Sequence, residues 1–384
     1  MSLALYIHWP FCLKKCPYCD FNSHVRDGVD VEAWESALLA DMAHEREATG
    51  PDTLGSIFFG GGTPSLMPPA LVERLIAEAT RLWPAQPGLE ITLEANPSSV
   101  EASKFADLAR AGVNRVSLGL QALNDDALQF LGRLHDVREG LAALDVAQKA
   151  FGRVSFDLIY TRPGQSVHQW RAELEQALSF GTGHLSLYQL TIEPGTRFAT
   201  DYRLGRFELP DEEVSAEMFA LTRTMTALAG LPAYEISNHA RPGEESRHNL
   251  TYWRYQDYVG IGPGAHGRRR GFATQRHKKP ENFLAAVERN QHGLSETRAL
   301  DPAECAAEAL MMGLRLTEGV DLAAMGQRFG IAPDALIDGR KAALYADLGF
   351  VERDGSHVTV TESGMVLLDS LLGELVAPGL MTEG

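Results

Sequence analysis

The sequence predicts an α/β protein, a partial (β/α)6 barrel of the TIM type followed by a winged-helix-like α+β domain. Six β-rich runs each precede a helix-length amphipathic segment, which indicates parallel βα units. Several runs are continuously apolar, as expected of strands covered on both faces. Unusual polar residues cluster where the runs end, the edge at which a barrel carries its chemistry. A doubly wound open sheet is the alternative arrangement of the same units.

The expected elements alternate through the first part of the chain. We expect strands at 4–9, 56–61, 89–95, 115–121, 153–160 and 184–192. The helices that follow them are expected at 31–48, 69–83, 99–111, 137–150, 168–180 and 211–229. Right-handed crossovers would curl these units into a barrel domain over residues 1–232.

The rest of the chain divides into two further segments. Residues 233–298 are rich in aromatic residues and glycine, and we expect mostly loop there. A separate domain is expected over 299–384, with helices at 302–316, 320–329 and 333–347, a hairpin at 350–361 and a last helix. Residues 301–384 hold 14 acidic against 5 basic residues, which favours a lid or a partner surface over DNA binding.

The composition excludes several classes of protein. The chain has 384 residues and a net charge of −16, which argues against a general nucleic-acid binder. No apolar run reaches the roughly 18–20 residues that a membrane span requires. The N-terminus shows no secretory signal pattern. We therefore expect a cytoplasmic protein.

Cysteines are concentrated near the N-terminus, where three of the four lie within eight residues as Cys12, Cys16 and Cys19. A [4Fe–4S] cluster normally takes four thiolates, so three would leave one iron open to a non-protein ligand. The alternatives are a zinc site completed by His8 or His24, or simply reactive thiols. Cys305 lies in an apolar helical pattern and is expected to be a buried structural residue.

The C-x3-C-x2-C spacing just after the first strand, with Tyr18 before the last cysteine, resembles the signature of the radical SAM enzymes. The resemblance implies a [4Fe–4S] cluster on Cys12, Cys16 and Cys19, with S-adenosylmethionine (SAM) bound at the open iron. The redox chemistry would then belong to the cofactors. The resemblance covers nearly the whole chain, including a HemN-type C-terminal domain.

Residues at successive strand ends resemble the SAM-binding positions of the coproporphyrinogen-dehydrogenase-like branch of this superfamily. The glycine-rich FFGGGTPS (58–65) lacks the GK[ST] of a phosphate loop, and a tight βα turn is its plain alternative. The resemblance implies that Gly61, Gly62 and Thr63 bind the methionyl amino group. The other SAM contacts that it implies are Tyr6, Tyr18, Glu94, Gln121, Arg133 and Asp157. TRPGQS (161–166) departs from the usual pattern and adds Arg162 near the mouth.

The HNLTYW motif at 248–253 resembles the H-N-x-x-Y-W marker of the HemW heme chaperone family. An imidazole is a standard axial iron ligand, and aromatic rings offer flat faces to a macrocycle. A core histidine beside two aromatic residues is the alternative. The resemblance implies heme binding by His248, Asn249, Tyr252 and Trp253. The basic run at 268–279 is expected either to pair with heme propionates or anionic lipid, or to be a solvated loop.

Two features distinguish the chain from the coproporphyrinogen III decarboxylases of the same branch. Phe21 stands where those enzymes carry a further cysteine, and the segment before Cys12 is too short for their N-terminal extension. The resemblance therefore implies a heme chaperone without that enzymatic activity, which delivers heme to a respiratory apoprotein. It also implies a homodimer and peripheral membrane contact. The alternatives are an oxygen-independent coproporphyrinogen III oxidative decarboxylase, or a radical SAM enzyme that methylates or opens a tetrapyrrole.

Overall fold

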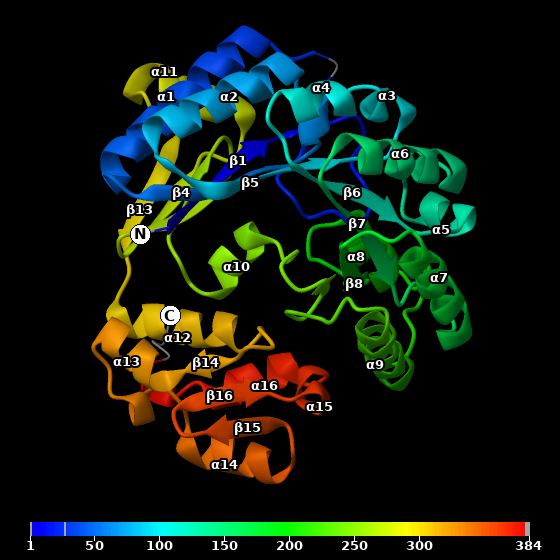
Figure 1. Cartoon of the computed structure of the whole chain (residues 1–384), viewed down its shortest axis with the longest axis vertical. Coiled ribbons are helices and arrows are strands. Elements are labelled where there is room, and N and C mark those ends of the chain that lie inside the picture. Colours follow the sequence, from blue (N-terminus) through cyan, green and yellow to red (C-terminus); the bar gives the residue numbers. More distant parts are fainter. Residues whose placement is uncertain (1, 27, 381–384) are drawn as a thin grey trace.

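The computed structural model describes residues 2–26 and 28–380, and in this part of the chain an 11-stranded sheet is the main feature (Figure 1). Its centre is formed by parallel strands that pair in chain order. These strands are β1 (Ser2–Trp9), β4 (Thr53–Gly61), β5 (Ala85–Ala95), β6 (Arg115–Gln121), β7 (Arg153–Tyr160) and β8 (His184–Gln189). Their order does not reverse, so the crossovers wind in one direction, as in a barrel rather than a doubly wound sheet.

Helices cover the convex face of this curved sheet (Figure 1). They are α1 (Val31–Thr49), α2 (Pro69–Leu82), α3 (Ser99–Ala102), α4 (Phe105–Arg110), α6 (Val137–Ala150), α7 (Val167–Ser179) and α9 (Glu212–Leu228). Their apolar faces bury side chains such as Leu38, Leu75 and Trp170 against the strands. Local capping agrees with these boundaries: α7 begins with a capping box between Ser166 and Gln169. The predicted partial barrel is confirmed.

A few boundaries differ from the prediction. The helix expected at 99–111 is divided into α3 and α4, and the sixth strand ends at Gln189 rather than at 192. Two short helices, α5 (Asp125–Phe130) and α8 (Arg197–Arg203), lie in segments with no predicted element. Each begins after a side-chain cap, Asn124 or Thr196, which is the local signal for these helices.

Residues 233–298 hold more regular structure than the loop that the sequence predicts. This segment contains β9 (Asn238–Ala240), α10 (Arg247–Trp253), β10 (Tyr258–Ile261), β11 (His266–Arg269), β12 (Phe272–Arg276), α11 (Pro280–Asn290) and β13 (Leu294–Ala299). β10 pairs in parallel with β1, and β11 to β13 continue that edge of the sheet antiparallel. These strands are short, and their own pattern shows little alternation. Pairing with β1 sets the register of β10, and each later strand is set by the one before it.

The basic run at 268–279 is largely part of this sheet. Arg269 forms a buried ion pair with Glu45 on α1. Arg276, which is fully buried, pairs with both Asp41 at 2.9 Å and Glu45 at 2.7 Å. The prediction of a solvated loop or ligand-binding run is therefore wrong for these two arginines, which attach α1 to β11 and β12.

The C-terminal region forms a compact unit with its own core around Leu310, Leu322, Val358 and Leu372 (Figure 1). It contains α12 (Pro302–Gly313), β14 (Val320–Asp321), α13 (Leu322–Phe329), α14 (Gly339–Asp347), β15 (Val351–Asp354), β16 (His357–Val360), α15 (Glu362–Met365) and α16 (Leu368–Leu375). The sheet order β14-β16-β15, together with α12, α13 and α14 ahead of the β15–β16 hairpin, gives the winged-helix-like arrangement. Residues 1, 27 and 381–384 of the predicted domains lie outside the described residues.

Candidate functional site

A cavity of about 1340 Å³ lies at the carboxyl ends of the parallel strands, and its lining comes from both the barrel and the C-terminal domain. It gathers most of the site residues that the sequence predicts. Those in its lining are Cys12, Cys16, Tyr18, Cys19, Gly61, Gly62, Thr63, Glu94, Gln121, Arg133 and Asp157. Tyr6 and the HNLTYW residues lie outside this lining.

The cysteine loop is closed by a pair of two-residue strands, β2 (Phe11–Cys12) and β3 (His24–Val25). The glycine-rich turn after β4 is bonded directly to it. The backbone N–H of Gly62 donates to Trp9 O at 2.7 Å, and that of Thr63 donates to Phe11 O at 2.8 Å. The turn and the cysteine loop therefore form one unit.

The two glycines of this turn are required by packing within the protein. A Cβ at Gly61, whose φ is +111°, would lie 2.6 Å from the imidazole of His8, and one at Gly62 would lie 2.6 Å from Phe11 O. The absence of side chains allows β4 to approach the strand that carries Cys12. This is a stricter constraint than the tight turn that the sequence suggests, and it places both backbones against the cavity.

Two of the three thiols receive hydrogen bonds from polar side chains. Thr63 Oγ1 donates to Cys12 Sγ at 3.4 Å, and Arg133 Nη1 donates to Cys16 Sγ at 3.4 Å. Burial raises the pKa of the Cys12 and Cys19 thiols, so these donors and a bound metal would be needed to favour thiolates.

Asn96, which sequence reasoning missed, joins these two donors. Its Oδ1 accepts from Arg133 Nη2 at 2.5 Å, and its Nδ2 donates to Thr63 Oγ1 at 3.2 Å. Its backbone N–H donates to Glu101 at 2.8 Å, which holds the residue in place. The available signal was its position just after β5, two residues beyond Glu94.

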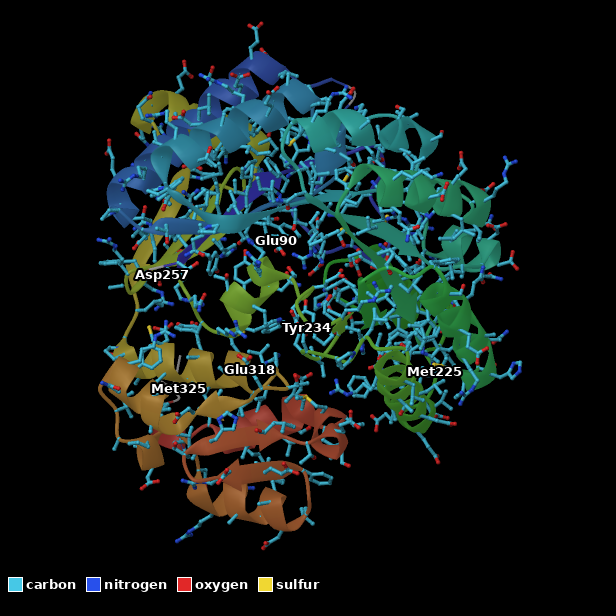
Figure 2. All side chains as sticks on the ribbon, viewed as in Figure 1. Glu90, Met225, Tyr234, Asp257, Glu318 and Met325 are labelled. Carbon is cyan, nitrogen blue, oxygen red and sulfur yellow. The ribbon has the colours of Figure 1, made fainter. Side chains whose placement is uncertain are left out.

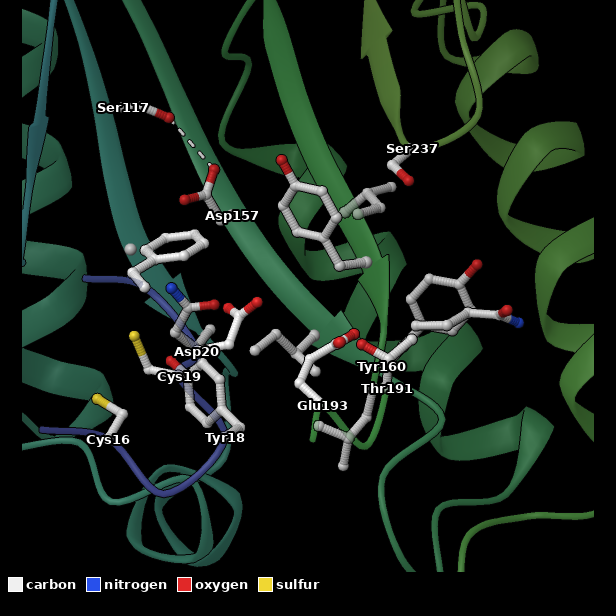
Figure 3. A pocket seen from close by; sticks show the side chains of 18 of the residues that line it. Cys16, Tyr18, Cys19, Asp20, Ser117, Asp157, Tyr160, Thr191, Glu193 and Ser237 are labelled. Atoms are coloured by element: carbon white, nitrogen blue, oxygen red, sulfur yellow. Dashed lines mark hydrogen bonds between the residues drawn. The ribbon is translucent and has the colours of Figure 1, made fainter. Parts of the chain in front are cut away.

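Two carboxyl groups face the cavity, and at each of them burial outweighs the hydrogen bonds and cations that stabilise the charge. Burial and the nearby charge of Asp157 raise the pKa of Glu94 to about 8. Burial raises the pKa of Asp157 to about 6, although Ser117 donates to it at 3.2 Å (Figure 3). Carboxyls with raised pKa values in a cavity are typical of ligand-binding or catalytic positions.

Two other predicted residues have clear local roles. Gln121 ends β6 with φ of 70°, a left-handed conformation that is uncommon for a residue other than glycine, and its side chain lines the cavity. Arg162 is buried and paired with the equally buried Glu173, which also accepts from Leu123 N at 2.7 Å. The sequence left the role of Arg162 open, and in the structure its buried pairing with Glu173 stabilises the loop after β7.

The cysteine loop suits a cluster better than a single metal ion. Within residues 2–26 and 28–380, no three His, Cys, Asp or Glu side chains converge as ligands of one ion. His8, a candidate zinc ligand, is already bonded through both nitrogens, to Tyr6 Oη at 3.0 Å and to Asn22 O at 2.9 Å. A cluster differs because each thiolate binds a separate iron. All four cysteines are free thiols, and the large cavity beside three of them fits a cluster with a further ligand.

The HNLTYW residues lie on α10, which packs against β4 on the inner side of the barrel. His248 is buried, and both its ring nitrogens have partners: Nδ1 lies 2.9 Å from Ser56 Oγ and Nε2 lies 2.8 Å from Tyr252 Oη. The ring stacks on Phe58 with centroids 4.8 Å apart. Burial lowers the pKa of His248 to about 3, so the imidazole is neutral.

α10 also connects the barrel to the C-terminal domain. At its start, the backbone N–H groups of Arg247 and His248 donate to Glu90 of β5. Just beyond its end, Arg254 makes a two-bond ion pair with Glu318, with both distances 2.7 Å. Figure 2 shows Glu90 and Glu318 on opposite sides of this helix. The motif is therefore part of the interface between the two domains.

None of the helices in the described ranges combines the length and apolar content needed to cross a bilayer.

The chain is similar to known proteins over its full architecture. The family model described as the radical SAM superfamily matches residues 6–177, and that of the HemN C-terminal domain matches residues 300–367. The heme chaperone HemW of Escherichia coli is 35% identical, with 96% of this chain and 97% of that protein covered. A mitochondrial relative from Bos taurus, radical S-adenosyl methionine domain-containing protein 1, is 42% identical over 83% of this chain and 74% of its own length.

Among solved structures, coproporphyrinogen III oxidase (HemN) from Escherichia coli, a radical SAM enzyme, has the same fold. The TM-score is 0.81 at 22% identity, with 97% of this chain and 89% of that chain covered.

Proposed function

Because the chain belongs to the radical SAM superfamily, in the family that includes the HemW proteins, we propose that it is a heme chaperone. In this proposal it binds a [4Fe–4S] cluster, SAM and heme, and delivers the heme to a respiratory apoprotein. The observation that carries the proposal is the 35% identity to a protein named heme chaperone HemW over 96% of this chain.

The cavity supports the cofactor part of the proposal. Cys12, Cys16 and Cys19 would hold the cluster, which when bound supplies an electron and an open iron position for SAM. Thr63 and Arg133 would support two of the thiolates through the hydrogen bonds described above. The SAM contacts would be Tyr18, Gly61, Gly62, Glu94, Gln121 and Asp157, all in the lining. Tyr6 lies outside the lining and would act indirectly, through its hydrogen bond to His8.

The heme-binding role of His248, Asn249, Tyr252 and Trp253 stays a prediction. For His248 to bind iron, the imidazole would have to give up a hydrogen bond to Tyr252 or to Ser56. The proposal has three further parts. The protein is cytoplasmic, it touches a membrane-bound acceptor peripherally, and it forms a homodimer.

The second candidate function is an oxidative decarboxylase of coproporphyrinogen III, which the shared fold with HemN favours. Phe21 argues against it. Its side chain is 56% exposed and lies at the cavity where the decarboxylases carry a further cysteine.

The deciding experiment is anaerobic reconstitution of the cluster, followed by incubation with SAM, a reductant and either hemin or coproporphyrinogen III. We expect stoichiometric hemin binding and unchanged coproporphyrinogen. A vinyl-containing porphyrin product would instead establish the decarboxylase.

A further inference from the structure

The cavity is larger than the polar site described so far. Its volume of about 1340 Å³ exceeds the roughly 300–1000 Å³ usual for one small-molecule site. In Figure 3, Cys16 and Cys19 lie on one side of the cavity, and Ser237 lies on the opposite side, with Asp157 between. The predicted cluster and SAM residues therefore occupy the end of the cavity near the cysteines, and the end near Ser237 is formed by other residues.

This far end is built by both domains and has an apolar wall, with Glu212, Glu213 and Asp369 also in its lining. The barrel contributes side chains from α9 and from the segment beside Ser237, and the C-terminal domain contributes the connection between α15 and α16. The apolar residues are Phe219, Ile236, Met365, Val366, Leu367 and Leu368. Val366 is 41% exposed and Leu367 is 44% exposed, so part of this wall is uncovered apolar surface, as in sites for apolar ligands.

Two arginines lie near the apolar wall, Arg315 in the cavity lining and Arg223 next to Phe219. Arg315 lines the cavity, and its nearest carboxylate is that of the highly exposed Asp369, at 3.2 Å. Arg223 lies one helical turn from Phe219 and is only 6% exposed. Among the described residues its Nε and Nη1 have no hydrogen-bond partner, and Glu362 is 3.8 Å away. Arg223 lies outside the cavity lining, so Arg315 is the cation of this wall that is available to a carboxylate on a ligand.

The HNLTYW helix offers no comparable space. His248 uses both ring nitrogens and is 1% exposed, and the helix joins Glu90 of the barrel to Glu318 of the C-terminal domain (Figure 2). Because the C-terminal domain forms half of the apolar wall, this helix holds that wall in position.

We propose that the apolar end of the cavity is the heme site: it takes a flat apolar macrocycle between Phe219 and the 365–368 segment, with the edge carboxylates toward Arg315. The HNLTYW helix positions the wall and does not bind the iron. This inference rests on the proposed function, and it places heme and SAM in one continuous cavity.

Hemin titration of the cluster-loaded full chain, followed by its Soret absorbance, tests the inference. Leu367→Asp should weaken hemin binding about tenfold or more, because it puts a charge where apolar area would be buried. Leu344→Asp is the matched control, since Leu344 is 48% exposed in the same domain but lies outside the cavity lining, and it should bind like wild type. Ile236→Trp, which fills the space, should also weaken binding. Cluster absorbance and circular dichroism establish that each variant is folded.

The outcomes separate this inference from the proposed function. If wild type binds no hemin, the heme chaperone proposal fails, and this inference with it. If wild type binds hemin, and Leu367→Asp and Ile236→Trp bind equally well while His248→Ala loses binding, the function stands and the location proposed here is overturned. Retained binding in His248→Ala together with weak binding in the two wall variants supports it.

Discussion

Glu90 and Glu94 lie four residues apart on β5, on the same face of the strand, yet their environments differ completely. Burial alone would raise the pKa of Glu90, but Arg115, Arg153 and two backbone N–H groups of α10 hold it below its usual value. Around Glu94, the backbone N–H of Gly61 and Arg115 do not outweigh burial and the charge of Asp157, and its pKa rises to about 8. The paired carboxylate stabilises the fold, and the uncompensated one is available to a ligand.

The largest expected effect concerns Glu90, the paired carboxylate. Glu90→Ala should lower the free energy of unfolding by about 3–5 kcal/mol, because it leaves Arg153 and the start of α10 without their buried partner. Urea denaturation measures this loss. The control is Glu281→Ala, which removes a surface partner of Arg26 and should leave stability nearly unchanged. Equal stability of Glu90→Ala and wild type would show that this pairing does not hold α10.

Glu94 is the other carboxylate of this comparison. Glu94→Gln should leave stability intact and, at pH 9 where Glu94 is ionised, weaken SAM binding about ten- to hundredfold, as for loss of a charged hydrogen bond. With a pKa of about 8, Glu94 is mostly protonated at pH 7 and ionises as the pH rises. SAM affinity of the wild type should therefore increase between pH 7 and 9, and that of Glu94→Gln should not. Calorimetric titration checks both, with Glu213→Gln at the rim as control. Unchanged SAM affinity in Glu94→Gln would remove this residue from the SAM site.

The neutral His248, whose helix is bonded to Glu90, makes the stability of the folded protein sensitive to acid. Its pKa is about 3 in the folded chain and about 6.5 when unfolded, so the unfolded state binds more protons between these values. The stability it contributes is complete above pH 6.5 and is lost as the pH falls toward 3, by about 2 kcal/mol at pH 5. Denaturation at pH 7 and pH 5 should show that His248→Gln loses less stability on acidification than wild type does. The same loss in both proteins would contradict a buried neutral imidazole.

The smallest expected effect concerns Asn96, which connects the donors to two thiols. Asn96→Ala should cost about 1 kcal/mol of stability and shorten the lifetime of the reconstituted cluster, because Thr63 and Arg133 lose their common anchor. Asn114 is a matched control, since it bonds only backbone groups of Leu89 and Ile91. Asn114→Ala should lose similar stability and keep the cluster. Equal cluster lifetimes in the two variants would exclude the role of Asn96.

Sequence reasoning was most successful where the signal is local. The strand and helix pattern of residues 1–232 predicted the partial barrel, and most of the cluster and SAM residues predicted from the sequence line the cavity. It was less successful for 233–298, where β10 takes its register from β1 and β11 to β13 take theirs from neighbouring strands. It also left the role of Arg162 open and placed Arg276 in a ligand-binding or solvated run, although each has a buried carboxylate partner.

The sequence by itself determined the barrel units and the grouping of Cys12, Cys16 and Cys19, because periodicity and close spacing are properties of neighbouring residues. Only the tertiary structure decided which buried polar groups are paired. Glu90 meets His248 and Arg276 meets Asp41 across 158 and 235 residues of chain. The cost of burying a charge depends on such distant partners, so the same residue type can stabilise the fold at one position and face a ligand at another.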